Sequence, residues 1–446
     1  CTIHISPDPN FEAVGKPEQR TTSTEWHGIW RLPVKVAEPL KLTTYVYNGD
    51  GGQYCAPQSA TVPGPTGSPQ PLGVLCSKTE QATTDANGSA GLTATPIGNP
   101  RTWRWTYSQY GQMLTADGPR TDVNDLTTYA YFEPADPDLG KRGNLMSVTN
   151  ALGQVTNITA YDGNGRPLTV VDPNGLATQL AYDPRGRLVS RSIGTETTTY
   201  QYDGVGQLLK ATLPDGSYVS YTYDAAHRLT GIADALGNQI LYTLDLVGNR
   251  IKEEVKDTGG QLARTRQRVF DTVSRLSQDI GAQGQITRYV YDGNSNLTMV
   301  QDPLYSASRT YFDALNRLIQ FTDPSGKYTS YAYDGQGQLI KVTDPRNLAT
   351  RYTVDGLGNR TQLVSPDTGT TNSLYDAAGN ETSRTDAKGQ TTTTQYDALN
   401  RPTRITYADG RQVDYGWDMG ANGLGKLGKI EERQNGQLVA SLVYTY

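Results

Sequence analysis

Short segments in which apolar and polar residues alternate recur along most of the chain. In the segment SYVSYTY, Tyr221 and Tyr223 fall on one side of an extended backbone, and Ser220 and Thr222 fall on the other. This two-residue period is typical of a β-strand. The turn-forming sequence DAAHR follows, and after it come a second short alternating segment and a second turn. The pattern predicts pairs of strands joined by tight turns.

An aromatic residue followed by aspartate ends the first strand of most pairs. We call this residue the marker. Counting degenerate forms, the markers are Tyr161, Tyr182, Tyr202, Tyr223, Leu244, Phe270, Tyr291, Phe312, Tyr333, Val354, Tyr375, Tyr396 and Trp417. From Phe270 onward every interval between markers is 21 residues. A period maintained over so many copies indicates a repeat architecture.

The repeat has no room for a crossover helix, so successive strands must pair antiparallel. A single hairpin is marginally stable, and each unit therefore needs its neighbours. We predict an all-β fold, a repetitive antiparallel β-hairpin ribbon. The aromatic markers are expected to form a structural ladder along one face, where each stacked pair of rings adds about 0.5–1.5 kcal/mol. Tyrosine suits this position because its hydroxyl can remain in water.

The domain organisation follows from how regular the repeats are. Residues 1–29 form an N-terminal segment, interpreted as the edge of a larger protein. Residues 30–160 contain irregular first repeats with an insertion at about 51–99, and residues 161–446 form the regular 21-residue array. The 26-residue interval before Phe270 is interpreted as a small turn insertion. For Cys1, the edge of a larger protein is favoured over a lipidated N-terminus or a free thiol.

Cys55 and Cys76 bracket a stretch rich in proline, glycine and serine within the insertion. A disulfide closing a loop of this length would stabilise the fold by about 3 kcal/mol in the chain-entropy model. The alternative is a pair of reduced cysteines in a cytosolic loop. We favour the disulfide, and we expect the insertion to be a surface loop that the disulfide clamps.

Composition and charge limit the partners. The 40 basic and 45 acidic residues give a net charge of −5 without long runs, so no binding to nucleic acid or to an anionic membrane is expected. No segment is long and apolar enough for a membrane span. With 29 Tyr and 47 Gly against five Phe and four Met, the chain suits thin sheets exposed to water.

The sequence offers little that could support catalysis or metal binding. His4, His27 and His227 are far apart, and no Cys/His cluster has ligand spacing. The glycines of GLGKLG lack the strand and helix of a dinucleotide site, and DGNSNL lacks the glycine of a calcium loop. We therefore expect no catalytic residue, no metal and no cofactor. The aspartates that follow the markers either open turns or form a carboxylate row for cations or sugars, and we favour turns.

The motif YDGxGQL…DG…YTYDAAHRL resembles the Rhs/YD repeats of bacterial polymorphic toxins, of insecticidal Tc toxin B/C components and of animal teneurins. The resemblance covers about 30–446. It implies a β-ribbon that spirals into a hollow shell, which in toxins encloses a C-terminal effector. The chain lacks the PxxxxxDPxG-type motif that marks self-cleavage in the family, and no toxin or delivery domain is recognised.

Two functions remain open at this stage. The first is a structural shell, secreted or at the bacterial cell surface, whose partner is a C-terminal toxin domain or other repeats of the same larger protein. The alternative is a recognition module for carbohydrate or for a target cell surface, based on the tyrosines that could stack on sugar rings. An enzyme is not expected, because the repeats contain no nucleophile–base pair.

Overall fold

The computed structural model describes residues 2–5, 20–64 and 67–446. Two single-turn 3₁₀ helices are present, η1 (Asp50–Gly52) and η2 (Gly91–Thr93). The first strands are β1 (Thr2–Ile5), β2 (Arg20–Trp26), β3 (Pro33–Glu38), β4 (Lys41–Tyr47), β5 (Thr61–Pro63), β6 (Pro69–Pro71), β7 (Leu75–Thr83), β8 (Pro96–Tyr107), β9 (Met113–Asp117), β10 (Thr127–Tyr131), β11 (Leu145–Thr149) and β12 (Val155–Tyr161).

The strands of the regular array are short and evenly spaced. They are β13 (Pro167–Val171), β14 (Ala177–Tyr182), β15 (Leu188–Ile193), β16 (Glu196–Tyr202), β17 (Leu208–Thr212), β18 (Tyr218–Tyr223), β19 (Leu229–Asp234), β20 (Gln239–Leu244), β21 (Arg250–Lys256), β22 (Leu262–Phe270), β23 (Leu276–Ile280), β24 (Ile286–Tyr291), β25 (Leu297–Gln301), β26 (Ala307–Phe312), β27 (Leu318–Thr322), β28 (Tyr328–Tyr333), β29 (Leu339–Thr343), β30 (Ala349–Val354), β31 (Arg360–Ser365), β32 (Gly369–Tyr375), β33 (Glu381–Thr385), β34 (Thr391–Tyr396), β35 (Pro402–Thr406), β36 (Arg411–Trp417), β37 (Leu427–Gln434) and β38 (Gln437–Val443).

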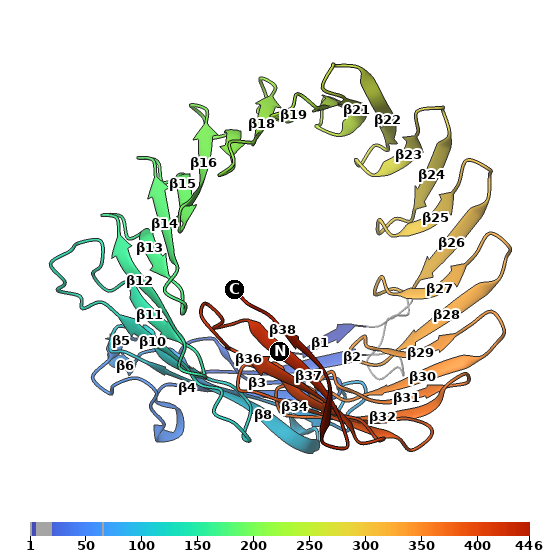
Figure 1. Cartoon of the computed structure of the whole chain (residues 1–446). Coiled ribbons are helices and arrows are strands. Elements are labelled where there is room, and N and C mark those ends of the chain that lie inside the picture. Colours follow the sequence, from blue (N-terminus) through green and yellow to red (C-terminus); the bar gives the residue numbers. More distant parts are fainter. Residues whose placement is uncertain (1, 6–19, 65–66) are drawn as a thin grey trace.

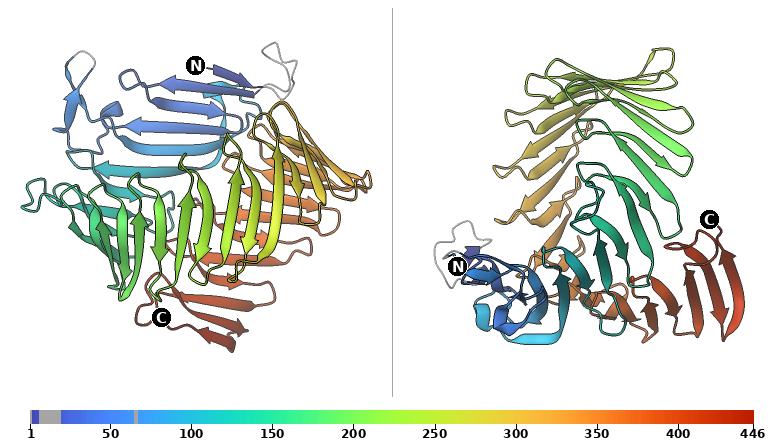
Figure 2. Two further views of the ribbon diagram at one scale, coloured as in Figure 1. Left: turned by 90° about the horizontal axis from the view of Figure 1, so that it is seen from above. Right: turned by 90° about the vertical axis from the view of Figure 1, so that its left-hand side faces the viewer.

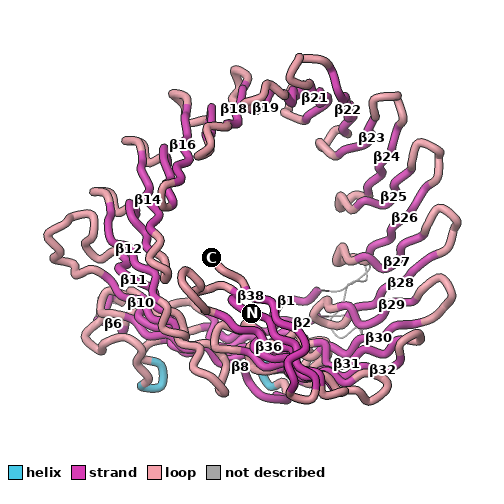
Figure 3. The backbone as a smooth tube through the Cα atoms, viewed as in Figure 1, coloured by secondary structure: helices cyan, strands magenta, loops and turns pink. Residues whose placement is uncertain are grey.

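All of these strands except β5 and β6 belong to one sheet of 36 strands. Each strand pairs antiparallel with its neighbour in the chain, and β4 pairs with β7 because β5 and β6 form a separate hairpin. Figure 3 shows that strands and the turns between them make up almost the entire backbone. The predicted all-β ribbon of antiparallel hairpins is confirmed.

The ribbon curves around a central axis as a wall one sheet thick. In Figure 1 it passes from β10 through β18 and β26 to β32 and returns to the region where it began. The views in Figure 2 separate the two terminal regions along the axis, so the path is a spiral and not a closed ring. The right-handed twist between neighbouring strands accumulates over so many pairs and bends the ribbon in this way. The chain thus forms a hollow shell or part of one.

Buried side chains concentrate near the N-terminal region, where loops cover the sheet. Ala37, Leu42, Tyr47, Cys76 and Ala82 are buried there, whereas the regular array consists almost entirely of half-buried and exposed side chains. A wall one sheet thick meets solvent on both faces, so its apolar residues are covered mainly by their neighbours along the ribbon. The low content of Phe and Met fits this arrangement.

Three boundaries differ from the sequence-based predictions. β2 already belongs to the sheet, so the ribbon starts before residue 30. The insertion predicted at about 51–99 is not one loop, because β7 crosses it as a full strand paired with β4 and β8. The five extra residues before Phe270 lengthen β21 and β22 to 7 and 9 residues and do not enlarge a turn. Alternation was weak in all three places. Cys1 lies outside the described residues.

Candidate functional site

The turn after each marker is built around its aspartate. At Asp183, the backbone N–H donates to the carbonyl of Arg187, and the N–H of Gly186 donates back to the carbonyl of Asp183. The carboxylate Oδ1 accepts the backbone N–H groups of Arg185 and Arg187 at 2.9 and 3.0 Å. Oδ2 accepts the Arg187 Nε–H at 2.6 Å. The carboxylate therefore accepts N–H groups of the turn that would otherwise bond water. This is expected for an aspartate that opens a turn.

The same arrangement recurs with arginine or asparagine four residues after the aspartate. Arginine takes this position after Asp162, Asp183, Asp224, Asp271, Asp313 and Asp397, and asparagine takes it after Asp245, Asp292, Asp355 and Asp376. The fourth turn residue has a positive φ, 86° at Gly186 and 64° at His227. A type I turn followed by such a residue produces a bulge, which is seen as a register shift just before Tyr182.

These contacts change the acidity of the turn carboxylates. The pKa of Asp183 lies below its ordinary value, chiefly because the backbone N–H of Arg187 bonds to the carboxylate. The pKa of Asp224 is also lowered, first of all by the side chain of Arg228. Hydrogen bonds to the ionised form favour that form. The carboxylates are thus held charged by the turn itself.

The marker side chains interact with the preceding repeat through a hydrogen bond and a cation–π contact. The hydroxyl of Tyr202 donates to the carbonyl of Leu188 at 3.0 Å, and the guanidinium of Arg187 lies 4.8 Å from the centroid of the Tyr202 ring. The same contact with arginine occurs at Tyr182, Tyr291, Tyr333 and Trp417. Where arginine takes this position, the repeat is thereby linked to the next one in the order Asp, Arg, aromatic marker.

This arrangement corrects two expectations about the ladder. Among the described residues, no two markers are in ring–ring contact, and the aromatic pairs that occur are His27–Tyr47 and Phe132–Tyr161. At five markers an arginine of the preceding repeat lies over the ring in place of a second ring. The hydroxyls of Tyr161, Tyr202, Tyr223, Tyr291, Tyr333, Tyr375 and Tyr396 donate to a backbone carbonyl of the preceding hairpin. Burial raises the pKa of Tyr223.

The spiral is closed by a seam between its first and second turns, a feature that the sequence analysis missed. Because strand direction alternates, all turns that follow markers lie along one rim of the wall, the marker rim, and the other turns lie along the opposite return rim. In the seam, the return rim of residues 20–174 lies on the marker rim of residues 313–425. The N-terminal and C-terminal strands meet in this region of Figure 1.

Arginines of the first turn of the spiral cross the seam to backbone and side-chain oxygens of the second. Arg20 donates to the carbonyl of Asp334 at 2.8 Å. Arg101 donates to Oδ1 of Asn359 at 2.7 Å. Arg120 donates to the carbonyl of Asp397 at 2.5 Å. The seam is therefore specified by charged donors that reach into successive marker turns.

Arg120 is the most enclosed of these side chains, at 2% exposed. Its Nη2 bonds Oδ2 of Asp122 at 2.6 Å, and its Nε lies 3.5 Å from Oδ2 of Asp376. Carboxylates from both turns of the spiral thus neutralise one buried guanidinium. Asn174 adds a reciprocal pair with Leu424, in which its Nδ2 donates to the carbonyl at 3.0 Å and its Oδ1 accepts the N–H at 2.8 Å.

The backbones of the two turns of the spiral approach each other closely where the marker turn contains glycine. A Cβ atom at Gly356 would lie 1.8 Å from the carbonyl oxygen of Leu40, and one at Gly335 would lie 2.1 Å from that of Ala86. At Gly204, the corresponding position outside the seam, a Cβ atom would meet nothing within 4 Å. The close approach of the backbone across the seam thus requires glycine at positions 335 and 356.

The disulfide joins Cys55 and Cys76 with their Cα atoms 5.4 Å apart. It connects the loop after β4 to the second residue of β7. The same loop is held by Asn48, whose Oδ1 accepts the backbone N–H groups of Cys55 and Ala56 at 3.0 and 3.1 Å. Both contacts attach the described part of the loop at 48–74 to the sheet.

The three histidines lie in different parts of the fold. His27 Nε2 lies 2.9 Å from Oδ1 of Asp50, and His227 occupies the positive-φ position of a marker turn. His4 lies in β1. Within the residues that the structure describes, no group of three or more His, Cys, Asp or Glu side chains could hold a metal ion. In the same residues, no helix has the length and apolar character needed to cross a bilayer.

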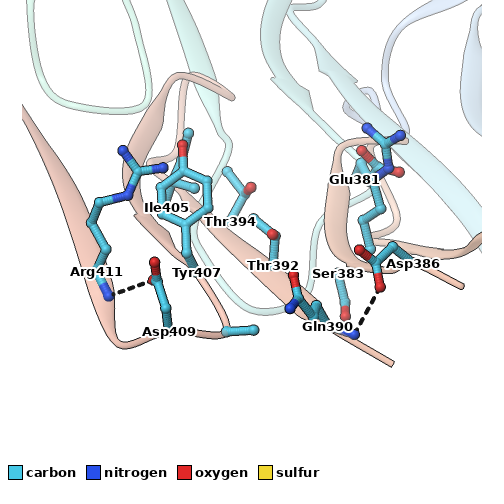
Figure 4. Close-up of a pocket in the computed structure, with 12 residues that line it drawn as sticks. Glu381, Ser383, Asp386, Gln390, Thr392, Thr394, Ile405, Tyr407, Asp409 and Arg411 are labelled. Carbon is cyan, nitrogen blue, oxygen red and sulfur yellow. Dashed lines mark hydrogen bonds between the residues drawn. The ribbon is translucent and has the colours of Figure 1, made fainter. Parts of the chain in front are cut away.

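A polar groove of about 600 Å³ lies over β33 to β36. Figure 4 shows Glu381, Asp386, Asp409 and Tyr407 among its lining residues. Asp386 and Asp409 accept backbone N–H groups of their own turns, from Gln390 and Arg411. The guanidinium of Arg411 lies 4.0 Å from the Tyr407 ring centroid and covers one face of the ring. Asp386, Asp409 and Arg411 thus make their contacts within the wall.

Comparisons with known proteins agree with this geometry. A family model described as RHS Repeat matches residues 161–199, 202–239, 312–347, 333–370 and 375–412. No curated protein matches the sequence. The structure is similar to the crystal structure of TcdB2-TccC3-TEV, with a TM-score of 0.60 and 14% identity over 95% of this chain and 24% of that chain.

A second similar structure is TcdB2-TccC3 without hypervariable C-terminal region, with a TM-score of 0.58 and 15% identity over 96% of this chain and 26% of that chain. The chain spans about a quarter of the length of these two structures. At such low identity the likeness shows the fold alone, and the repeat match supplies the family. The matched repeats and the spiral ribbon together identify the chain as an Rhs/YD-repeat protein.

Proposed function

We propose that this chain is wall material of an Rhs-type shell that encloses and delivers a C-terminal effector. The observation that carries the proposal is the seam, in which arginines and close-packed glycines join successive turns of a one-layer wall. A ribbon without such contacts would remain an open coil, whereas a sealed spiral separates an interior from bulk solvent. A structure related in fold is described as lacking a hypervariable C-terminal region, which fits a constant wall with variable contents.

The shell acts outside the cytoplasm in this proposal, as a secreted or bacterial cell-surface protein. The Cys55–Cys76 disulfide supports this location, because disulfides persist in oxidising compartments. The partner is a C-terminal toxin domain or further repeats of the same larger protein. The wall itself takes no catalytic role.

Protease protection tests the proposal. In the full natural-length protein, the C-terminal segment should resist a broad-specificity protease while the shell is intact. The double variant R101A/R120A, which removes two seam donors, should expose that segment and accelerate its digestion. R346A/R185A is the matched control, since both arginines lie in exposed turns away from the seam. Equal digestion rates in the seam variant and the unaltered protein would contradict enclosure.

Carbohydrate recognition, the alternative function, gains no specific support from the site. Sugar binding by aromatic stacking requires an open ring face, whereas Arg187, Arg275 and Arg317 lie over marker rings. In the polar groove, Arg411 occupies a face of Tyr407. The hydrogen bonds of the marker tyrosines give these rings a structural role that needs no ligand.

A further inference from the structure

The turn between β2 and β3 is a marker turn built around a histidine. β2 ends at the aromatic residue Trp26, and a register shift just before this residue marks the same bulge as in the regular repeats. His27 follows in the place of the usual aspartate, and its backbone N–H donates to the carbonyl of Leu32 at 2.7 Å. Arg31 supplies the positive φ, 53°. The turn thus has the marker architecture with one additional residue.

The imidazole of His27 combines the contacts that aspartate and arginine make in a regular repeat. Its Nδ1 accepts the backbone N–H groups of Ile29 and Trp30 at 3.1 and 3.2 Å, as a carboxylate does in the other turns. The ring also lies edge to face against Tyr47 of the next hairpin, with centroids 5.8 Å apart. The hydroxyl of Tyr47 donates to the carbonyl of Pro33 at 3.0 Å, as marker hydroxyls do elsewhere. One side chain therefore closes the turn and links it to the next repeat.

These contacts fix which ring nitrogen carries the proton. An Nδ1 atom that accepts two N–H groups has no hydrogen of its own, so the neutral ring is protonated at Nε2. This Nε2 lies 2.9 Å from Oδ1 of Asp50 and donates to it. An imidazole ordinarily takes up a second proton between about pH 5 and pH 8. The carboxylate of Asp183 and the hydroxyl of Ser108, which are the acceptors of other marker turns, ordinarily keep their charge in that range. The His27 turn therefore has an acceptor that mild acid removes.

The groups around the imidazole determine what protonation does. Among the described residues, the titratable side chains in contact with the ring are Asp50 of η1 and Tyr47 of β4. Arg31, on the turn itself, is exposed. The carboxylate of Asp50 attracts a positively charged ring, whereas the N–H groups of Ile29 and Trp30 repel a proton on Nδ1. Protonation therefore keeps the ring at Asp50 and breaks its contacts with the turn.

The same turn contacts both ends of the loop at 48–74. Asp50, near the start of the loop, bonds His27. Near the other end, a Cβ atom at Gly73 would lie 3.2 Å from Cδ2 of Trp30, so the indole packs directly against the backbone there. The bond from the Trp30 N–H to Nδ1 of His27 holds this indole in place. Loss of that bond frees the indole from Gly73.

We propose that His27 is a pH-sensitive latch for this loop. The neutral ring closes the turn, and Trp30 then holds the second end of the loop. In mild acid the charged ring stays with Asp50 and releases the turn, so Trp30 leaves Gly73 while the disulfide and Asn48 still hold the loop. The response is local, because the carboxylates of the regular array remain ionised down to about pH 4.

Hydrogen exchange at about pH 8 and about pH 5.5, corrected for the intrinsic rate at each pH, tests the latch. Protection at 27–32 and in the loop at 48–74 should fall about tenfold or more at the lower pH, because two N–H groups lose their acceptor. The regular array should keep its protection. H27N supplies an acceptor oxygen that takes up no proton in this range, so its protection should be equal at both pH values. H227N, the matched control, introduces the residue that Asn316 places at the same turn position, and should retain the full fall.

Nitrogen NMR of the chain labelled with ¹⁵N in histidine gives a second readout. The His27 signals, identified by their absence in H27N, should show an unprotonated Nδ1 at about pH 8 and an imidazolium over the same range in which protection falls. If the H27N turn is open at both pH values, this coincidence in the unaltered chain decides. Formation of the imidazolium without loss of protection overturns the proposal, as does a neutral ring with its proton on Nδ1. An equal fall in H27N, or no fall in the unaltered chain or in H227N, also overturns it.

Discussion

The hydroxyl of Tyr333 donates a hydrogen bond to the backbone carbonyl oxygen of Leu318, 2.8 Å away and 15 residues earlier in the chain. Arg317, the residue before Leu318, places its guanidinium 4.8 Å from the centroid of the same ring and bonds Asp313. One side chain of a repeat thus contacts two consecutive residues of the repeat before it. Rigid coupling of neighbouring hairpins explains how units that are marginal alone form a continuous wall.

The variant Y333F tests the hydrogen bond separately from the ring. It retains the cation–π contact and leaves the carbonyl of Leu318 without its donor, so we expect a loss of about 1 kcal/mol in the free energy of unfolding. Urea denaturation measures the change. Y311F is the control, because the Tyr311 ring is exposed on a strand face, and its unfolding free energy should stay within about 0.5 kcal/mol of the unaltered chain. A Y333F value equal to that of Y311F would contradict a structural role for the hydroxyl.

The close approach across the seam makes a second prediction. In G356A the added methyl group would meet the carbonyl of Leu40, so the two turns must separate, at a cost of about 1–3 kcal/mol. We expect faster hydrogen exchange at the turns Asp355–Asn359 and Asp376–Asn380 while the rest of the ribbon keeps its protection. G204A has the same repeat position and open space around it, and should exchange like the unaltered chain. Unchanged exchange in G356A would exclude the seam in solution.

Removal of Arg120 tests the polar part of the seam. R120A deletes the donor to the Asp397 carbonyl and leaves the carboxylate of Asp376, which is 9% exposed, without this cation. Loss of one partner from an enclosed charged network costs about 3–5 kcal/mol. The loss should appear as local opening of β34 and its marker turn in hydrogen exchange, before global unfolding. R346A, a control in an exposed return turn, should leave exchange of β34 unchanged.

The sequence predicts the local structure well because the signals are local. The marker period, the alternation and the spacing of four residues from Asp183 to Arg187 all describe contacts inside one hairpin. The partner of the tyrosine hydroxyl was missed because alternation shows which face a side chain takes and not which carbonyl lies beside it. The repeated order of Asp, Arg and the next marker was a signal that could have revealed the arginine contact.

The seam could not be predicted from the sequence in this way. Arg120 and Asp397 are separated by 277 residues, and their meeting depends on how much twist accumulates over the strands between them. A small change in twist for each strand would shift the second turn past its contacts. Gly356 likewise resembles Gly204 in sequence, although only the former faces another turn. Residues in the irregular first repeats carry the seam, where the pattern is weakest.

Reduction of the disulfide gives a local loss of stability. The Cys55–Cys76 bond closes a loop of 21 residues, and its removal should cost about 3 kcal/mol in the chain-entropy model. Intact-mass measurement should show a gain of two hydrogens after reductant. Limited proteolysis should then cut within 48–74, although Asn48 still holds the backbone at Cys55, while the array from 161 stays resistant. Identical masses before and after reduction would reject the bond.

Acid should weaken the wall through its turn carboxylates. The pKa values of Asp162, Asp183, Asp224 and Asp271 are lower in the folded chain than in the unfolded chain. The unfolded chain therefore binds protons first, and stability that is fully present above the unfolded pKa, near about 4, falls as the pH drops through the folded values. Urea midpoints measured from pH 7 to pH 3 should be flat at first and then decline steeply. The variant D183N keeps an acceptor oxygen but cannot ionise, so its decline should be shallower. A midpoint that rises as the pH falls below about 4 would contradict the lowered pKa values on which this prediction depends.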